Sequence, residues 1–291
     1  MRALGLDLSH WDWSFDPDKS VGVIDFVIQK VSEGLYQDPR LEIIWSGVKK
    51  VPIRGAYHYL RSAYSWKDQV DFFLNIVNKK DYHILALDYE NIGNILDANF
   101  ADMAHKWMDY IKSMTTKLVI LYTNPSIYDI RLYPYGNWMI DYPLWIAQYW
   151  TSNIGPDRNP GMPKNRKDWA IYQWASEINY AGHGREYGCG LDLNKSTSVD
   201  LNVFNGTAIE MQKWVNTGTT PPPPPPPPPV VKTGYVNAAI GLNVRNQPST
   251  LGKKLYAIPY KTSIVIYAEK DGWYKISSSE EWVLGIYITL K

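Results

Sequence analysis

Residues 83–91 read HILALDYEN, and this stretch decides how the fold is interpreted. The apolar run from Ile84 to Leu87 predicts a buried strand that leads straight into Asp88 and Glu90. Because side chains alternate across a strand, the two carboxylates project from one face, roughly 6–7 Å apart. Their mutual repulsion raises at least one pKa, which keeps a carboxylic acid protonated for general-acid chemistry. A solvated acidic turn after a core strand is the alternative interpretation.

Further short β-runs in residues 1–216 alternate with helical patterns, which indicates parallel α/β units. The eight expected strands are 3–7, 26–31, 53–59, 84–90, 118–123, 144–149, 170–174 and 199–204. Two helices are expected, with Ser65 and Asn99 as their N-caps. Little helical sequence separates the last three strands. The predicted fold is therefore α/β, an irregular TIM-like (β/α)8 barrel with missing helices.

Acidic residues recur at the strand ends of this barrel. Asp7 ends the first strand, Asp88 and Glu90 end the fourth, and Asp200 lies in the eighth. In (β/α)8 barrels the catalytic residues lie where the strands end. The first and eighth strands are neighbours in a closed barrel, and the fourth lies across the mouth. This convergence favours a catalytic site over a solvated turn.

The charge distribution differs between the two ends of the chain. The 291 residues carry a net charge of +1. Residues 230–291 hold eight Lys or Arg and four Asp or Glu, a net of +4, which leaves −3 on residues 1–229. The total gives no indication of nucleic-acid binding, whereas the basic tail suits an anionic surface. Ordinary surface variation is the alternative explanation.

Cysteine and histidine usage excludes several site types. Cys189 is the single cysteine and the five histidines are scattered, so no disulfide, metal or other cofactor is expected. The N-terminus lacks the apolar stretch of a signal peptide, and no apolar run reaches the length of a membrane span. We expect a protein that is made in the cytoplasm and acts after release by another route.

Residues 221–229 are nine consecutive prolines. Such a run forms an extended polyproline helix and acts as a semi-rigid spacer. We therefore expect a catalytic domain over residues 1–216, a linker over 217–232 and a second domain over 233–291. A ligand for proline-binding domains is the alternative role of the proline run.

Eight motifs follow one another along residues 1–216. They are Asp7-Leu8-Ser9, Lys30-Val31-Ser32-Glu33, Gly55-Ala56-Tyr57-His58-Tyr59, Leu87-Asp88-Tyr89-Glu90, Leu121-Tyr122-Thr123-Asn124, Leu144-Trp145-Ile146-Ala147-Gln148-Tyr149, Tyr172-Gln173-Trp174 and Val199-Asp200-Leu201-Asn202. On these motifs the region resembles glycoside hydrolase family 25, the Chalaropsis-type lysozymes common among phage endolysins. The resemblance implies an N-acetylmuramidase that hydrolyses the β-1,4 bond between N-acetylmuramic acid and N-acetylglucosamine in peptidoglycan.

The resemblance also implies roles for the four acids. Glu90 would be the general acid that protonates the leaving oxygen. Asp88 would orient and polarise the substrate's N-acetyl group, which attacks the anomeric carbon in place of an enzyme nucleophile, with retention. Asp7 and Asp200 would raise the pKa of Glu90, and Asp200 would help to position the acetamide or water. Two acids on one side of the sugar fit this better than double displacement, but direct attack by Asp88 and base catalysis through water stay open.

Polar and aromatic contacts to the sugars are implied as well. The expected residues are Lys30, Glu33, Tyr59, Tyr122, Trp145, Gln173 and Trp174. For each of the aromatic residues a place in the core is the alternative.

Two features depart from the family pattern. Asp12 stands where the family usually has Gln or Asn, which adds a carboxylate near the mouth. Residues 181–190 form a longer Gly-rich stretch than expected, either a flap over the cleft or a surface insertion. A second Asp-Leu-Asn begins at Asp192, but Asp200 matches the family pattern better.

Residues 234–291 show short β-runs with turn signals and predict a small all-β barrel. Leu242-Asn243-Val244-Arg245 and Trp282-Val283 are similar to motifs of the bacterial Src-homology-3 family, whose modules in endolysins dock on the cell wall. Trp273, Tyr274 and Trp282 are the expected wall-binding aromatics. A module that folds back on the proline run is the alternative.

Peptidoglycan is thus the expected partner, both as substrate and as wall ligand. The target bacterium and the oligomeric state stay open. Two other functions also stay open, namely a barrel glycosidase on chitin-like N-acetyl sugars and an inactive cell-wall-binding protein. The four mutually repelling acids argue against the second, because an abandoned site need not keep them.

Overall fold

The structure, a computed structural model, describes residues 1–12, 22–90, 93, 95–150, 155–176, 199–218, 232–277 and 280–291. The chain divides into two compact units, Met1–Pro223 and Pro224–Lys291. The proline run, Cys189, Asp192 and the stretch 181–190 lie outside the described residues.

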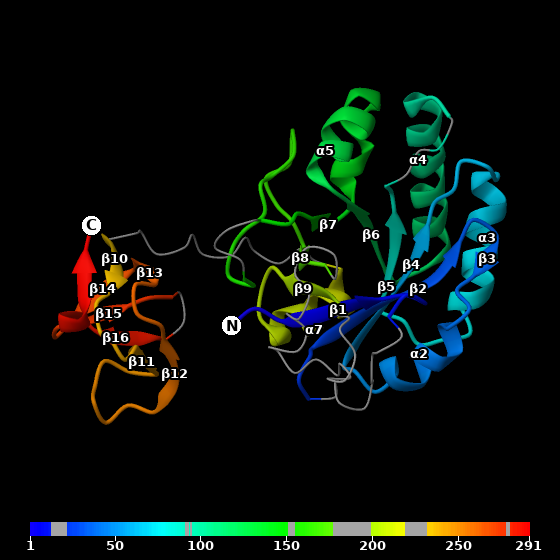
Figure 1. Cartoon of the computed structure of the whole chain (residues 1–291). Helices are drawn as coiled ribbons and strands as arrows, with labels where there is room; N and C mark the ends of the chain where they lie inside the picture. The colour runs from blue at the N-terminus through cyan, green and yellow to red at the C-terminus, as the bar shows by residue number, and fades with distance from the viewer. Residues whose placement is uncertain are drawn as a thin grey trace. The chain divides into compact units, whose positions relative to one another are not determined.

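Eight strands of the first unit close into a barrel (Figure 1). They are β1 (Leu4–Leu8), β2 (Phe26–Glu33), β4 (Ile53–Tyr59), β5 (Ile84–Asp88), β6 (Leu118–Thr123), β7 (Leu144–Ala147), β8 (Ile171–Ala175) and β9 (Asp200–Phe204). The hydrogen-bonded order is β1-β9-β8-β7-β6-β5-β4-β2, and pairing of β1 with β2 closes the ring. A short strand, β3 (Tyr36–Gln37), forms an antiparallel hairpin with β2. Each of the eight expected strands overlaps one of these barrel strands.

The last barrel strand differs in direction from the others. β9 is antiparallel to both neighbours, β1 and β8, so the expectation of parallel units throughout is wrong for this strand. Because β9 runs in reverse, its first residue lies at the edge where the parallel strands end. Asp200 therefore pairs in register with Asp7.

The two expected helix caps have different outcomes. Ser65 caps α3 (Trp66–Val77), where its side chain accepts a hydrogen bond from the backbone N–H of Lys67. Asn99 is not a cap, because α4 (Asp97–Met114) begins two residues earlier with Leu96 at the N-cap position. Asp97 in the first turn suits the positive end of the helix dipole there.

Other helical segments were not expected from the sequence. They are α2 (Leu41–Val48), α5 (Pro125–Ile127), η1 (Tyr128–Leu132), η2 (Tyr133–Tyr135), η3 (Trp138–Asp141) and α7 (Ala208–Thr217). The start of α7 is a capping box, in which Thr207 and Glu210 each bond the other's backbone N–H. This T-x-x-E signal was readable in the sequence.

Strand alternation divides the core of the first unit into two layers. Outward-facing strand residues such as Leu6, Leu85 and Leu87 pack with the buried faces of α2, α3 and α4. Inward-facing residues form a second cluster that includes Phe26, Ile28, Tyr57, Tyr122 and Trp145, with Met211 and Trp214 of α7. A side chain at Gly5 would clash with the Phe26 ring, since a Cβ there would lie 2.4 Å from it. Because apolar side chains fill the barrel interior, the polar side chains lie at its mouth.

The second unit is entirely β apart from one short 3-10 turn, η4 (Gly285–Tyr287), among its described residues. One sheet has the order β13 (Ser263–Ile266), β10 (Lys232–Val236), β17 (Ile288–Leu290). The other has the order β12 (Lys254–Ile258), β11 (Leu242–Arg245), β16 (Trp282–Leu284), β15 (Trp273–Lys275), β14 (Ala268–Lys270). Its core centres on Val236, Val244, Ile266 and Val283. This agrees with the small all-β barrel expected from the sequence.

Two searches of the described residues gave negative results. None of the described helices combines the length and apolar character needed to cross a bilayer. In the same part of the chain, no group of three or more His, Cys, Asp or Glu side chains is placed to hold a metal ion.

Candidate active site

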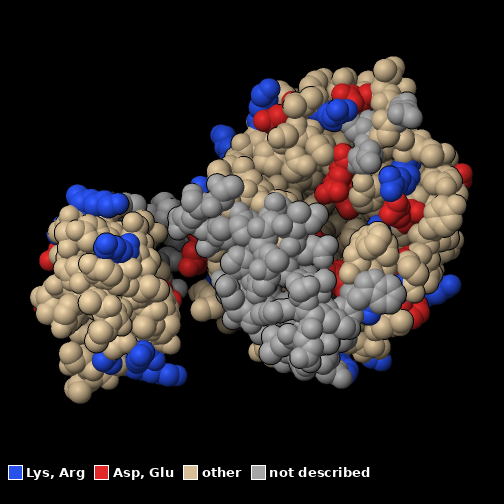
Figure 2. All heavy atoms as spheres, in the orientation of Figure 1, with Lys and Arg blue, Asp and Glu red and all other residues tan. Residues whose placement is uncertain are grey.

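The four predicted acids meet at the mouth of the barrel. Asp7 and Asp88 lie near the carboxyl ends of β1 and β5, Asp200 begins the reversed β9, and Glu90 lies two residues beyond β5. In the ring of eight strands, β5 lies across the barrel from β9. The charge of Glu90 raises the pKa of both Asp88 and Asp7, which shows how near the acids are to one another. Figure 2 shows acidic side chains gathered in a hollow of the first unit beside basic ones.

Asp88 and Glu90 share a face because Tyr89 is anchored on the other one. The backbone N–H of Tyr89 donates to the Tyr122 carbonyl (3.0 Å), which continues the strand pairing past Asp88. The Tyr89 ring is buried in the outer core against Phe100, with ring centroids 4.8 Å apart. The expected same-face placement of the two acids therefore agrees with the structure.

Asp7 is held by two amide side chains. Its Oδ2 accepts hydrogen bonds from Gln173 Nε2 (2.7 Å) and Asn202 Nδ2 (2.6 Å). Asn202 is itself fixed, since its Oδ1 accepts from Trp145 Nε1 (2.8 Å). Burial raises the pKa of Asp7 to about 6, although the two amide hydrogen bonds lower it.

Gln173 links the Asp7–Asp200 pair to two tyrosines. Its Nε2 also donates to Asp200 Oδ2 (3.1 Å), and its Oε1 accepts from the hydroxyls of Tyr122 (2.9 Å) and Tyr149. These four bonds use the full capacity of the amide. Only 1% of Gln173 is exposed. Gln173 therefore holds two carboxylates in place, and its expected contact with sugar stays a prediction with little of the side chain exposed.

The Asp88–Glu90 pair is held differently. Burial is the main cause that raises the pKa of Asp88 well above its usual value, followed by the charge of Glu90. Asp88 Oδ1 is buried and has no hydrogen-bond partner among the described residues. One acceptor of this pair is thus unused by the described part of the protein.

Burial also raises the pKa of Glu90. A hydrogen bond with Tyr122 and the charge of Lys30 lower it. From the sequence we expected Asp7 and Asp200 to raise the pKa of Glu90. In the structure the leading cause of the raised pKa is the burial of Glu90 away from solvent.

Lys30 is a buried cation beside these acids. Lys30 pairs with Tyr57, and a bulge at Val31 then shifts the register so that Glu33, rather than Ser32, lies opposite Tyr59. Lys30 Nζ therefore reaches Glu33 Oε2 at 2.6 Å, and Arg61 binds the other oxygen of Glu33. Only 6% of Lys30 is exposed, and its charge lowers the pKa of Asp88.

The remaining predicted residues have varied positions. Tyr122 and Trp145 line the interior and contact the carboxylate network, whereas Trp174 lies in the outer core and does not line the mouth. The reason is alternation, because its neighbour Gln173 takes the inward position. Asp12 Oδ2 accepts from the backbone N–H of Ser9 (2.7 Å), so this extra carboxylate stabilises the turn after β1.

Sequence reasoning missed several polar residues of this site. Asn202, Tyr149 and Arg61 each contact a predicted site residue. Asn202 follows Asp200 at the same-face spacing of two, so the strand pattern could have identified it. Arg61 follows β4 by two residues and gave no local signal.

The expected wall-binding aromatics are mostly covered. Trp273 and Trp282 are each 7% exposed, and Tyr274 is half-buried. The tyrosines with the most exposed surface in the second unit are Tyr256 and Tyr260, at 45% and 48%. Wall binding through Trp273, Tyr274 and Trp282 stays a prediction, with little ring surface of the two tryptophans open to a ligand.

Comparison with known proteins gives two family matches. The model of glycosyl hydrolases family 25 matches residues 6–183, and that of the bacterial SH3 domain matches residues 240–289. The second match confirms the predicted Src-homology-3-like fold.

Individual proteins match this chain at 24–28% sequence identity. The uncharacterized protein YegX of Escherichia coli (strain K12) is 28% identical over 221 residues, 73% of each chain. Lysozyme M1 of Streptomyces globisporus is 26% identical over 227 residues, 73% of this chain and 71% of that protein. The crystal structure of the bacterial lysozyme from Streptomyces coelicolor has a TM-score of 0.60 at 24% identity, covering 75% of this chain and 99% of that one. This likeness confirms the predicted irregular barrel.

Proposed function

The chain belongs to glycosyl hydrolases family 25, and we propose that it is an endolysin-type N-acetylmuramidase. It would hydrolyse the β-1,4 bond between N-acetylmuramic acid and N-acetylglucosamine in peptidoglycan. Membership in the family makes it a glycoside hydrolase, and the relative named Lysozyme M1 supports the choice of substrate. The observation that carries the proposal is the pair of buried Asp88 and half-buried Glu90 at the barrel mouth, with one Asp88 oxygen that has no partner among the described residues.

Glu90 is the general acid of the proposed reaction. Burial raises the pKa of Glu90 and so favours the neutral form, which can give a proton to the glycosidic oxygen. As that proton transfers, the bond between the anomeric carbon and the leaving oxygen breaks. Tyr122 contacts Glu90 and fixes where the carboxyl group lies.

Asp88 binds the acetamide of the sugar that is cut. Its Oδ1, which has no partner in the described part of the chain, accepts the acetamide N–H, and the acetamide oxygen then attacks the anomeric carbon to form a cyclic oxazolinium. The N–H bond favours the ionised form of Asp88, so the proton of the pair stays on Glu90. Glu90, now a carboxylate, takes a proton from the water that opens the ring, and the configuration at the anomeric carbon is retained.

The second unit is proposed to hold the enzyme on the cell wall. Its family match and its basic excess support this role, since bacterial walls carry anionic groups. Tethering raises the local concentration of the enzyme near an insoluble polymer. Removal of every residue after Gly218 should leave cleavage of soluble wall fragments intact and lower lysis of whole cells. Equal lysis by both forms would remove the binding role.

Mass spectrometry of digested peptidoglycan tests the reaction itself. Borohydride reduction of the products should label N-acetylmuramic acid, and digestion in H2¹⁸O should place the heavy oxygen on that sugar. Labelled N-acetylglucosamine would instead indicate cleavage of the other bond. Turnover of chitooligosaccharides without cleavage of walls would support the chitin-type glycosidase, and no new reducing end would support an inactive binding protein.

The proton NMR spectrum recorded during hydrolysis tests retention. The β-anomer should form first and then equilibrate with the α-anomer. Initial formation of the α-anomer would exclude both acetamide participation and direct attack by Asp88, and would favour base catalysis through water.

A further inference from the structure

His58 is a buried titratable side chain that the proposed reaction does not use. It lies on β4, and none of its surface is exposed. Its ring packs against Phe73 of α3 and is stacked on Trp107 of α4, with ring centroids 5.7 and 5.6 Å apart. Burial lowers the pKa of His58 to about 4, so the imidazole is neutral near pH 7. A neutral imidazole offers one donor and one acceptor.

Both ring nitrogens of His58 have fixed partners. Nε2 lies 3.2 Å from Gln69 Oε1, and Nδ1 lies 2.9 Å from Ser32 Oγ. The orientation of the Gln69 amide is set by Arg61, whose backbone N–H donates to Oε1 (2.9 Å) and whose carbonyl accepts from Nε2 (2.9 Å). Because Gln69 Oε1 is an acceptor, His58 Nε2 carries the proton. Nδ1 is therefore the acceptor for the Ser32 hydroxyl.

Ser32 belongs to the bulge of β2, where two residues lie opposite one residue of β4. Lys30 faces the barrel interior, so strict alternation would turn Ser32 inward and Glu33 outward. Instead Val31 packs in the outer core, and Ser32 reaches His58 on that same side. The extra outward residue turns Glu33 back to the face of Lys30. The bond to His58 selects this arrangement, because the Ser32 hydroxyl reaches Nδ1 only when it faces outward.

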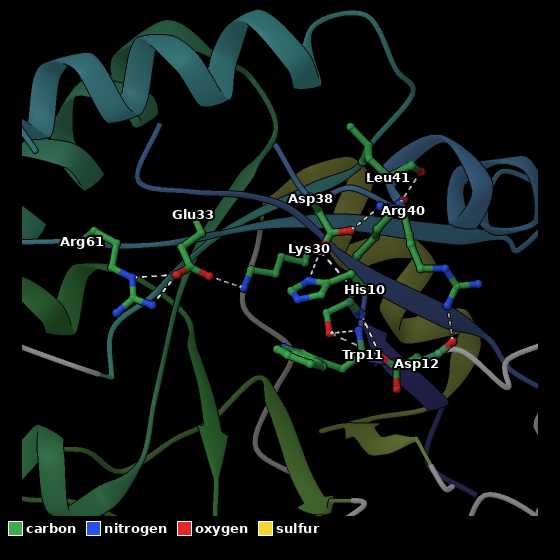
Figure 3. Close-up of polar contacts among 11 residues, drawn as sticks. His10, Trp11, Asp12, Lys30, Glu33, Asp38, Arg40, Leu41 and Arg61 are labelled. Atoms are coloured by element: carbon green, nitrogen blue, oxygen red, sulfur yellow. Dashed lines mark hydrogen bonds and ion pairs between the residues drawn. The ribbon is translucent and has the colours of Figure 1, made fainter. Parts of the chain in front are cut away.

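The inward Glu33 is the counter-ion of Lys30. Figure 3 shows Glu33 between two cations, where it accepts from Lys30 Nζ (2.6 Å) and from Arg61 Nε (2.7 Å). The charge of Lys30 lowers the pKa of both Asp88 and Glu90. The charge of Glu33 acts in the opposite direction on Asp88. If Glu33 left this face, the Lys30 charge would act on the two acids without compensation, and they would lose a proton more readily.

We propose that His58 is a positioning residue, whose hydrogen bond to Ser32 fixes the bulge of β2. The bulge in turn keeps Glu33 beside Lys30. The second hydrogen bond of His58 fixes which ring nitrogen faces the bulge. The inference rests on the proposed function, because it concerns the proton that Glu90 donates. It adds a residue of the outer core that acts on this proton without contact to the substrate.

The test measures the apparent ionisation midpoint of the Glu90 carboxyl carbon by ¹³C NMR in the full chain. Ser32→Ala removes the hydroxyl donor and changes the volume of the side chain little. Glu33 should then no longer be held beside Lys30. The Glu90 midpoint should fall by about one pH unit, the lower end of the effect of a nearby opposite charge.

Two amide substitutions at position 58 separate the bond to Ser32 from the ring. The amide of Asn lies about where Nδ1 lies, so His58→Asn keeps an acceptor for the Ser32 hydroxyl. The amide of Gln lies about where Nε2 lies, so His58→Gln keeps the bond to Gln69 and loses that acceptor. Both variants lose the ring stacked on Trp107. Only His58→Gln should therefore lower the Glu90 midpoint.

Ile111→Ala is the control for general loosening, since it truncates a buried apolar side chain one turn further along α4. It should keep the wild-type midpoint. An unchanged or raised midpoint in folded Ser32→Ala would overturn the proposal. An equal fall in Ile111→Ala, or equal midpoints in His58→Asn and His58→Gln, would also overturn it and assign any effect to lost packing. If the two variants at position 58 do not fold, Ser32→Ala and its control decide.

The pH profile of kcat/KM on soluble wall glycans separates failure of this proposal from failure of the proposed function. The alkaline limb should move to lower pH by about one unit in Ser32→Ala, because Glu90 loses its proton there. If wild type cleaves no glycan but the NMR midpoints differ as expected, the proposed function is wrong and the positioning role of His58 stands. If wild type cleaves the glycan and the midpoints are equal, the positioning role is wrong and the function stands.

Discussion

The two carboxylate pairs at the barrel mouth differ in how the protein holds them. Asp7 and Asp200 are bridged by Gln173, and Asn202 binds Asp7 as well. Asp88 is buried and Glu90 is half-buried, yet Asp88 keeps one oxygen without a partner among the described residues. Fixed amides hold Asp7 and Asp200 in place, whereas the unused oxygen of Asp88 can accept a hydrogen bond from a substrate. We therefore propose that the β5 pair performs the chemistry and that the β1–β9 pair positions the site.

The largest effect is expected for Glu90→Gln. The amide cannot donate an acidic proton, so kcat should fall by about 10²–10⁴-fold, the usual contribution of general-acid catalysis. Turbidity clearing of purified cell walls measures the loss, and circular dichroism checks that the variant stays folded. Lysis at the wild-type rate by the folded variant would refute the assignment.

A smaller loss is expected for Asp88→Asn. The amide removes the negative charge that stabilises the oxazolinium but keeps the shape of the side chain. A loss of about 10²-fold in kcat should follow, larger than the loss in Asp7→Asn measured on the same soluble glycan. If Asp7→Asn is the more damaged variant, the division between the two pairs is wrong.

The ionisation of Asp7 should instead affect how the free energy of unfolding depends on pH. Its pKa is about 6 in the folded protein and near 3.9 when unfolded, so the folded state binds more protons between these values. The free energy of unfolding should therefore fall as pH rises from about 4 to 6, by about 3 kcal/mol for this group. Asp88 contributes with the same sign.

Denaturant unfolding of wild type and Asp7→Asn across pH 4–7 measures that term. The variant should lose less stability over this range, because it has no acid to ionise at position 7. If the free energy of unfolding changed with pH equally in the two proteins, the pKa of Asp7 would not be raised in the folded state.

The smallest effect is expected for Trp145→Phe. The substitution removes the Nε1–H that Asn202 Oδ1 accepts, and it leaves a buried acceptor unpaired. A destabilisation of about 1–3 kcal/mol should follow. Denaturant unfolding of wild type and Trp145→Phe measures this loss. Equal free energies of unfolding in the two proteins would show that the bond from Trp145 to Asn202 does not stabilise the site.

Local patterns predicted the acids well because strand alternation is a local rule. The shared face of Asp88 and Glu90 follows from their spacing alone. The position of Asp200 was reached through an assumption of parallel strands, whereas the actual cause is the reversed direction of β9. Trp174 was misplaced because its aromatic character was given more weight than its alternation with Gln173.

Contacts between distant segments could not be predicted in this way. One pocket at the barrel mouth is lined by residues of the turn after β1 and of the β2–β3 hairpin, together with Arg61. The sequence of any one of these segments does not indicate that the three meet. The same holds for the four bonds of Gln173, whose partners come from four different strands or their ends. The Asn99 cap failed for a different reason, since the backbone of Leu96 begins the helix without a side-chain cap.

The most direct test of the central claim is a ¹³C NMR titration of the Glu90 carboxyl carbon in the full chain. The loss of its signal in Glu90→Gln assigns it. Burial of the β5 pair predicts an apparent midpoint above the usual value for glutamic acid. A midpoint at or below that usual value would contradict the account, because Glu90 would then hold no proton for the leaving oxygen.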